Sequence, residues 1–270
     1  MHPIMIQAFG LSIHSYGVML AVGFMVGISL AAREAVRTGL DPEKVLNLAF
    51  WILLSSIVGS RLFHCAVFYP EYLRQPLRIF KLWEGGLVFY GGFLAAVTAA
   101  VLYTRIHRLN FWRVGDVLMP SVILGLVFGR IGCTLAGCCY GKPAGPDFAF
   151  AITFHNPLGL GVKNVPLYPT QILSALNALV IFTIVWLYRK KKRFHGEVTF
   201  LCLLLYSVTR FLIEFLRDDP RGFLSVAGLR LSESQIVSIG MVLFAAYILV
   251  WVRPRQPLSG NLATVRKNKP

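Results

Sequence analysis

The sequence predicts an all-α integral membrane protein of seven transmembrane helices, with the N-terminus outside and the C-terminus in the cytoplasm. Three observations predict this class. Of 270 residues, 56% are hydrophobic and only 14% are charged, whereas about 25% of the residues of a soluble domain are charged. The charged residues gather between long apolar runs. Their excess of Lys and Arg, 27 against 12 Asp and Glu, therefore indicates a membrane protein and not a nucleic-acid binder.

A transmembrane helix needs roughly 17 to 25 mostly apolar residues to cross the hydrocarbon of a bilayer. Seven runs reach or approach this length, and the second is the shortest. They are Tyr16–Ala32, Val45–Ser60, Gly85–Thr104, Val114–Ala136, Tyr168–Tyr188, Val198–Leu216 and Gln235–Trp251. The first run ends in Arg33 and Glu34 without a small-residue cleavage site, so we expect a retained helix and not a signal peptide.

The numbers of Lys and Arg in the loops predict the orientation of these runs in the membrane. The loops on the side of the N-terminus carry 9 Lys and Arg, and those on the other side carry 16. Because cytoplasmic loops are enriched in Lys and Arg, the N-terminus is predicted outside.

We expect a single transmembrane domain across residues 1–270. Within it, residues 1–15 form an outer amphipathic arm on the membrane surface. Residues 16–252 form the seven-helix bundle. Residues 253–270 form a basic cytoplasmic tail, either held near anionic headgroups or acting only as a topology signal.

The five cysteines are too few for a disulfide scaffold, and none form the paired C-x₂-C spacing of a zinc site. We interpret Cys138 and Cys139 as small packing residues. The sequence therefore predicts no metal site.

Two arginines lie inside the apolar runs, where a guanidinium costs about 2.5 to 3.5 kcal/mol, which makes each a functional candidate. Arg130 and Arg210 each lie some six residues before the outer end of their run, roughly 9 Å deep at 1.5 Å per residue. On the sixth run, Glu214 and Arg217 follow Arg210 on one helical face. Arg210 and Glu214 could simply pair and pin two helices together. Arg130 has no acidic neighbour within a turn, which favours a lipid phosphate as its partner.

Other polar side chains occur at the same predicted depth and suggest an outward-facing cavity. They are Tyr16, Arg61, His64, Tyr90 and Gln171. Glycines recur near them, at Gly91, Gly92, Gly125, Gly129 and Gly132, and close helix packing is the ordinary explanation for such spacing.

Taken in chain order, these segments resemble the signature of the bacterial prolipoprotein diacylglyceryl transferases. The matching segments are Ser15-Tyr16-Gly17, Gly59-Ser60-Arg61-Leu62, Glu84-Gly85-Gly86 with Gly91-Gly92, Gly129-Arg130-Ile131-Gly132 followed by Gly137 and Tyr140-Gly141, Tyr168-Pro169-Thr170-Gln171, and Arg210-Phe211-x-x-Glu214-Phe215-x-Arg217. The family also has seven spans with the N-terminus outside.

The resemblance implies an enzyme of the bacterial cytoplasmic (inner) membrane. It would transfer the diacylglyceryl group of phosphatidylglycerol to the lipobox cysteine of a preprolipoprotein signal peptide, releasing glycerol 1-phosphate without a cofactor, a metal or a nucleic-acid partner. Arg130 and Arg210 match essential family arginines that would bind the phosphate, and Glu214 would orient Arg210. Tyr16 matches a tyrosine of the active cavity. Further residues assigned to the lipid site are Arg61, Gly91, Gly92 and Gln171.

The chain departs from the family pattern at several positions. Tyr90 replaces the usual histidine, and His64 stands where a tyrosine often occurs. Cys133 and Cys138 replace an asparagine and an acidic residue. Because an imidazole accepts a proton at neutral pH and a phenol does not, we hypothesise that His64 assists the substrate thiol and that Tyr90 donates a hydrogen bond to phosphate or to His64. An interfacial His64 with no part in catalysis is the alternative.

Two further functions remain open at the level of sequence. A transporter or flippase for an anionic lipid or solute could use the same arginines, although we find no internal repeat or paired broken helices. A catalytically inactive relative could still bind phosphatidylglycerol.

Overall fold

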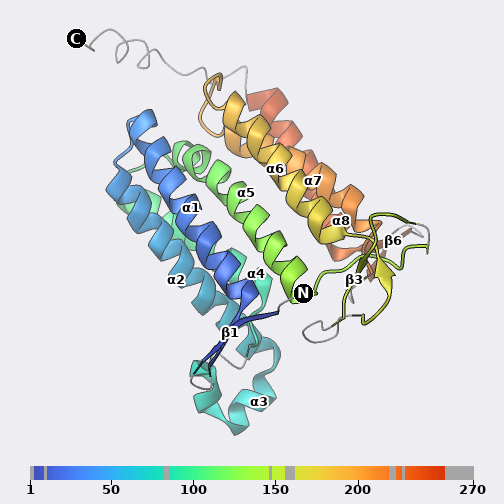
Figure 1. Ribbon diagram of the computed structural model, residues 1–270. Coiled ribbons are helices and arrows are strands. Elements are labelled where there is room, and N and C mark those ends of the chain that lie inside the picture. Colours follow the sequence, from blue (N-terminus) through green and yellow to red (C-terminus); the bar gives the residue numbers. More distant parts are fainter. Residues whose placement is uncertain are drawn as a thin grey trace. The chain divides into compact units, whose positions relative to one another are not determined.

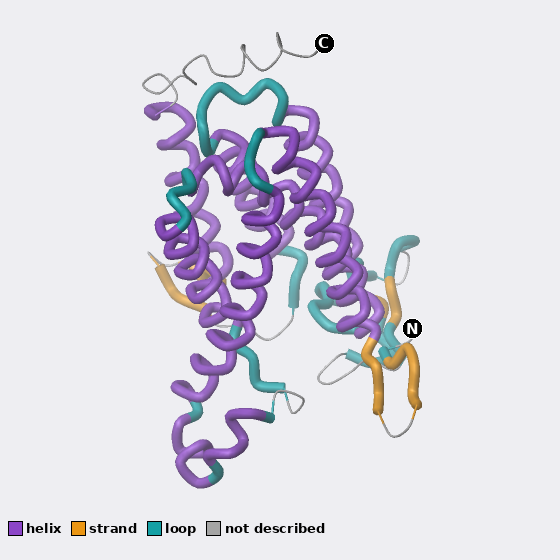
Figure 2. The backbone as a smooth tube through the Cα atoms, turned by 90° about the vertical axis from the view of Figure 1, so that its left-hand side faces the viewer, coloured by secondary structure: helices purple, strands orange, loops and turns teal. Residues whose placement is uncertain are grey.

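The computed structural model describes residues 3–8, 11–81, 85–145, 148–155, 162–218, 223–226 and 229–252. These residues form long helices with three short antiparallel hairpins, and the strands stand out in Figure 2. Their contacts divide the chain into two units. We call residues 30–117 the central unit, and residues 1–29 with 118–270 the flanking unit. Figure 1 labels the elements of both.

Six of the described helices are long and apolar enough to cross a membrane. They are α1 (Ser15–Thr38), α2 (Pro42–Val67), α4 (Phe89–Ile106), α5 (Phe111–Ala136), α6 (Thr170–Tyr188) and Glu233–Trp251, which contains α8 (Glu233–Tyr247) and most of the π-helical turn η3 (Ile248–Val252). Large apolar side chains stay exposed along them, such as Leu176, Val180 and Leu187 of α6. Because exposed apolar surface of this extent suits lipid, the chain is a multi-pass membrane protein.

The sixth expected span corresponds to α7 (Glu197–Glu214), which is not among these six helices. Its 18 residues include Glu197, Arg210 and Glu214, and charges lower the apolar character of a short helix. The total of seven spans, with α7 as one of them, and the orientation of the termini therefore stay predictions.

The second apolar run forms a longer helix than its sequence predicts. It was expected to be the shortest, at 45–60, but α2 has 26 residues. Asp41 caps its start by accepting a hydrogen bond from the Glu43 backbone N–H at 2.9 Å, with Pro42 at the first helical position. The helix continues past Arg61 and His64 because both side chains find partners in the segment that follows.

The start of the third run also differs. It was expected at Gly85, but Gly85 and Gly86 have φ of 81° and 76°, which is left-handed and incompatible with an α-helix. Helix α4 therefore starts at Phe89. The fourth and fifth runs end at Ala136 and Tyr188, as predicted.

Helices α2 and α4 pack very closely in the central unit. A Cβ built at Gly91 would lie 2.3 Å from Phe63 Cβ and 2.5 Å from the Gly59 carbonyl oxygen. A Cβ at Gly92 would lie 2.3 Å from Ser60 Oγ. Only glycine allows this approach. The short helices α3 (Tyr69–Arg74) and η1 (Pro76–Phe80) follow α2.

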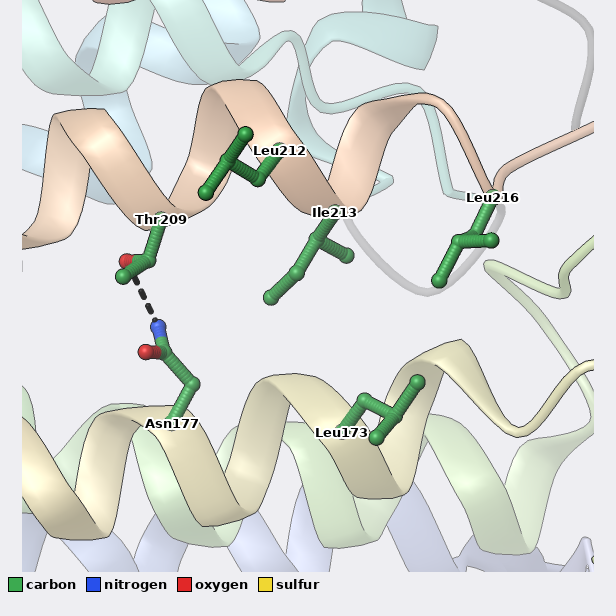
Figure 3. Close-up of a pocket in the computed structure, with 6 residues that line it drawn as sticks. All are labelled: Leu173, Asn177, Thr209, Leu212, Ile213 and Leu216. Carbon is green, nitrogen blue, oxygen red and sulfur yellow. Dashed lines mark hydrogen bonds between the residues drawn. The ribbon is translucent and has the colours of Figure 1, made fainter.

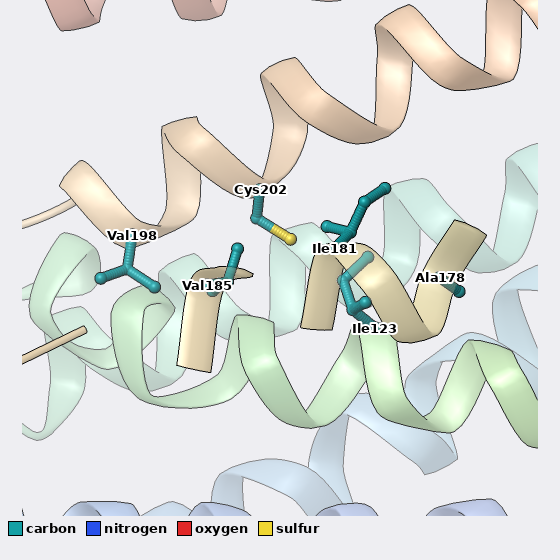
Figure 4. Close-up of a cluster of buried hydrophobic side chains, with 6 residues drawn as sticks. All are labelled: Ile123, Ala178, Ile181, Val185, Val198 and Cys202. Atoms are coloured by element: carbon teal, nitrogen blue, oxygen red, sulfur yellow. The ribbon is translucent and has the colours of Figure 1, made fainter. Parts of the chain in front are cut away.

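In the flanking unit, α6, α7 and α8 lie side by side (Figure 1). A buried apolar cluster joins α6 and α7 to the part of α5 that belongs to this unit (Figure 4). Its members are Ile123, Ala178, Ile181, Val185, Val198 and Cys202.

One hairpin of the flanking unit precedes α1, and the other two lie between α5 and α6 and between α7 and α8. Strands β1 (Ile4–Ala8) and β2 (Leu11–His14) occupy most of the predicted N-terminal arm, β3 (Ile152–Thr153) pairs with β4 (Pro166–Leu167), and β5 (Phe223–Val226) pairs with β6 (Leu229–Ser232). Sequence analysis did not anticipate these hairpins. The predicted tail, 253–270, and Glu84 of the family signature lie outside the described residues.

Candidate functional site

Arg130 and Arg210, the two arginines that the sequence predicts inside the membrane, line one small cavity of the flanking unit. Three helices contribute to it, each with residues spaced three or four apart, which places them on one helical face. The lining residues are Leu126 and Arg130 of α5, Ser174 and Asn177 of α6, and Tyr206, Arg210 and Ile213 of α7. The two arginines thus share one cavity, and their equal depth in the membrane stays a prediction.

The two arginines differ in their partners. The Arg210 guanidinium forms an ion pair with Glu214 one turn later and donates a hydrogen bond to Ser234 Oγ of α8 at 3.1 Å. Within the described part of the chain, no carboxylate pairs with the Arg130 guanidinium. The cavity therefore combines one arginine held by a carboxylate with a second whose charge is available to an anion.

An apolar groove of about 340 Å³ lies beside this cavity (Figure 3). It is lined by Leu173, Asn177, Thr209, Leu212, Ile213 and Leu216. Asn177 and Ile213 border both the groove and the arginine cavity. At one end, Asn177 Nδ2 donates to Thr209 Oγ1 at 2.9 Å and bridges α6 to α7. The arginine cavity itself is only about 10 Å³. Its charged lining next to an apolar groove has the two kinds of surface that an anionic lipid presents.

Tyr16 lies at the start of α1 against α5. A Cβ built at Gly132 would lie 3.1 Å from Tyr16 Cδ2, so Gly132 leaves the space that the ring needs. The Tyr16 hydroxyl interacts electrostatically with Arg130 and with the thiols of Cys133, Cys138 and Cys139. Tyr16 and Arg130, predicted as site residues, are thus close to each other.

Three cysteine thiols meet where α5 ends. The Sγ atoms of Cys133, Cys138 and Cys139 all lie within 4.8 Å of one another. Gly137, with φ of 75°, ends the helix in the usual way, and the Cys138 N–H donates back to the Cys133 carbonyl at 3.2 Å. The chain reversal brings Cys138 and Cys139 back beside Cys133.

The two cysteines beyond the helix differ in acidity. Hydrogen bonds from the Cys133 and Cys138 thiols lower the pKa of Cys139, and the nearby positive charge of Arg217 lowers it further. The hydrogen bond to Cys133 lowers the pKa of Cys138, but contact with Cys139 and burial outweigh it and raise that pKa to about 11. The neighbouring thiols and Arg217 therefore favour the thiolate form of Cys139.

Helix α6 holds this cysteine loop through its first turn. Thr170 Oγ1 donates to the Cys139 carbonyl at 3.1 Å, and Gln171 Nε2 donates to the Cys138 carbonyl at 2.9 Å. Gln171 is buried. The amide N–H of Gln171 thus holds the loop backbone. Its role at the lipid site stays a prediction.

The remaining predicted site residues belong to the central unit. Arg61 is buried and donates to five carbonyl oxygens, those of Arg78, Ile79, Lys81, Gly85 and Gly86. These bonds occupy the five N–H groups of the guanidinium. Arg61 thus anchors the segment after α2, and its predicted contact with lipid is not tested.

His64 and Tyr90 are not hydrogen-bonded to each other among the described residues. His64 Nδ1 lies 2.9 Å from the Tyr72 hydroxyl, and its ring stacks obliquely on Phe68. The Tyr90 side chain is exposed and meets Phe89 edge-on. Gly91 and Gly92 serve the close packing of α2 on α4, the ordinary explanation considered for them.

Sequence reasoning missed five of the seven residues that line the arginine cavity, three of them polar, and it missed the meeting of the three thiols. Ser174, Asn177 and Tyr206 lie at helical spacing from Gln171 and Arg210, and this spacing could have found them. The thiols follow a C-x₄-C-C pattern across a helix-ending glycine, and a helix stop at Gly137 would have predicted their convergence.

Comparison with known proteins supports the predicted family. Residues 3–251 match the family model described as prolipoprotein diacylglyceryl transferase. The chain is 33% identical over 249 residues to a phosphatidylglycerol–prolipoprotein diacylglyceryl transferase of Clostridium tetani, covering 92% of this chain and 96% of the relative. It is 34% identical to enzymes of the same name from Bordetella bronchiseptica, covering 90% and 92%, and from Nitrosospira multiformis, covering 96% and 89%. The chain belongs to the prolipoprotein diacylglyceryl transferase family.

Proposed function

We propose that this protein transfers the diacylglyceryl group of phosphatidylglycerol to the cysteine thiol of a prolipoprotein. The names of its relatives give the donor and the acceptor, and their agreement disfavours the transporter and inactive-relative alternatives. In the reaction, a carbon–sulfur bond forms to the glyceryl carbon that carried the phosphate. The carbon–oxygen bond breaks, glycerol 1-phosphate leaves with the bonding electrons, and a base takes the thiol proton.

The arginine cavity supports this function because both charges serve the leaving group. As the carbon–oxygen bond breaks, negative charge grows on the departing phosphate. Arg130 and Arg210, which line one cavity, would hold the phosphate oxygens and stabilise that charge. Glu214 would fix the Arg210 side chain and so orient its guanidinium toward the phosphate. The sharing of one cavity by both arginines is the observation that carries the proposal.

The groove between α6 and α7 would hold part of a lipid acyl chain. Its lining is apolar apart from Asn177 and Thr209, which bond to each other. Because the groove shares Asn177 and Ile213 with the arginine cavity, a lipid could place its phosphate in one and its tail in the other. The lipid would then reach the site sideways from the bilayer.

The reaction would take place at the outer face of the bacterial inner membrane. The distribution of Lys and Arg among the loops favours an N-terminus outside, and the helix ends nearest Arg130 and Arg210 would then face outward. The lipobox cysteine of a preprolipoprotein signal peptide would approach from the same side. Tyr16, beside Arg130, would border the path of the thiol.

A phosphate clamp predicts that lysine cannot replace either arginine. Lysine keeps the charge but loses the bidentate geometry of the guanidinium. We expect Arg130→Lys and Arg210→Lys each to lower turnover at least about tenfold. This corresponds to a rise of about 1.4 kcal/mol in the activation free energy. The assay uses purified protein, phosphatidylglycerol and a lipobox peptide, with thioether formation followed by mass spectrometry. Arg105→Lys, at an exposed position, is the control and should keep full activity. Full activity in both Arg→Lys variants would rule out the proposed phosphate-binding role of these arginines.

Thiol activation is proposed for His64. The motivating observation is the exchange of residue types, with His64 and Tyr90 in each other's usual place in the family pattern. If His64 accepts the thiol proton, His64→Gln should lower turnover by about 10²-fold and remove the acid limb of the pH–rate profile. Tyr72→Phe removes only the hydroxyl that neighbours the His64 ring and should keep that limb. A His64→Gln enzyme with the parental pH profile would assign proton removal to water.

A further inference from the structure

We propose that Cys133, Cys138 and Cys139 form a binding site for a soft monovalent metal ion, Cu⁺. The three Sγ atoms already lie within 4.8 Å of one another. Thiolate sulfur is the ligand that Cu⁺ prefers over harder ions. This site is argued separately from the transfer reaction, since the proposed phosphate clamp uses Arg130 and Arg210 and none of the three thiols.

The spacing of the sulfurs fits a three-coordinate ion. At a metal–sulfur distance of about 2.3 Å, three sulfurs around one ion lie about 4 Å apart. The observed upper limit of 4.8 Å needs only small side-chain rotations to reach this value. Cys133 is buried, while Cys138 and Cys139 are partly exposed, so an ion could enter past the loop cysteines and be held from the helix side.

The backbone around the thiols is fixed before any ion binds. The chain reverses at Gly137, and Cys139 adopts a φ of 62°, which is costly for a residue other than glycine. Hydrogen bonds from Thr170 and Gln171 to the Cys139 and Cys138 carbonyls hold this conformation. A rigid loop preserves the ligand geometry and limits the ordering cost of metal binding.

Charge and ligand number favour Cu⁺ over Zn²⁺. Among the residues that the structure describes, the group contains no fourth cysteine, histidine or carboxylate, whereas structural zinc takes four protein ligands. Three thiolates and one Cu⁺ carry net negative charge. The Arg217 side chain is buried and hydrogen-bonds Cys139, so it can offset part of that charge.

The test is anaerobic titration of the full chain in detergent with Cu⁺, in competition with the chelator bicinchoninate. We expect one Cu⁺ per chain in the wild-type protein. The control, with Cys65→Ser and Cys202→Ser together, keeps the three thiols and should bind the same amount. Cys133→Ser and Cys139→Gly should each weaken Cu⁺ binding at least about tenfold. Glycine suits the positive φ at position 139, so this variant removes the thiol without added strain.

X-ray absorption at the copper edge adds a structural measurement. Three sulfur neighbours at one distance would support the site. Unchanged Cu⁺ uptake in Cys133→Ser and Cys139→Gly would overturn it, as would loss of uptake in the control variant. Free thiols are counted in the protein purified under reducing conditions. A disulfide between two of the three cysteines would also overturn the proposal.

Discussion

Two helix pairs of this protein differ in how closely their helices pack. Between α2 and α4, glycines bring the backbones so close that a Cβ at Gly59 would lie 2.7 Å from the Gly91 carbonyl oxygen. Between α6 and α7, larger side chains leave a groove of about 340 Å³, with the Asn177–Thr209 hydrogen bond at one end. Without a hydrophobic force between helices in lipid, close packing stabilises the first pair. The second pair packs less closely and leaves the groove in which we propose that a lipid acyl chain binds.

The largest effect should come from adding one carbon to the tight pair. In Gly91→Ala the new methyl group meets Phe63 Cβ and the Gly59 carbonyl oxygen, and backbone cannot move aside as a flexible side chain can. We expect a loss of about 3 kcal/mol of stability, measured as a lower midpoint of thermal unfolding in detergent. Gly240→Ala in α8 has no atom within 4 Å of its new Cβ and should be neutral or gain up to about 1 kcal/mol. Equal behaviour of the two variants would contradict the tight packing.

Filling the groove should affect activity more than stability. Leu173→Trp adds bulk to the groove wall and should lower kcat/KM about tenfold for long-chain phosphatidylglycerol. A short-chain phosphatidylglycerol should be affected less than about twofold, because its tail would not reach the groove. Leu176→Trp, exposed on the same helix, is the matched control. If both variants slow both lipids equally, the groove does not hold an acyl chain.

The smallest effect should come from the bond that bridges α6 and α7. Thr209→Val removes the oxygen that accepts from Asn177 Nδ2. Hydrogen bonds between membrane helices contribute about 0.6 kcal/mol on average, so the unfolding midpoint should fall only slightly. Thr183→Val removes a hydroxyl that donates to the Leu179 carbonyl within α6 and serves as the control. A loss of several kcal/mol in Thr209→Val alone would show that this bond, and not the apolar cluster, holds the pair together.

Helix boundaries were predictable where an apolar run met a glycine or proline that interrupts helices. Gly137 and Pro169 stand at the boundaries of α5 and α6, and both boundaries agree with the sequence to within two residues. The start of α4 and the end of α2 were not predictable from the runs. At Gly85 the backbone takes a left-handed conformation, and at Arg61 the charge is satisfied by carbonyls up to 25 residues away. Both depend on contacts remote in sequence.

The sequence by itself determined the class of the protein, the two arginines that interrupt its apolar runs and the family to which it belongs. Those follow from hydrophobicity, from the cost of burying charge and from the order of motifs. Only the tertiary structure decided which groups meet. It brought Asn177 and Tyr206 to the cavity of Arg130 and Arg210, occupied Arg61 with backbone carbonyls and gathered three thiols at one helix end. The physical reason is that helical periodicity fixes which residues share a face, whereas packing between helices fixes which faces touch.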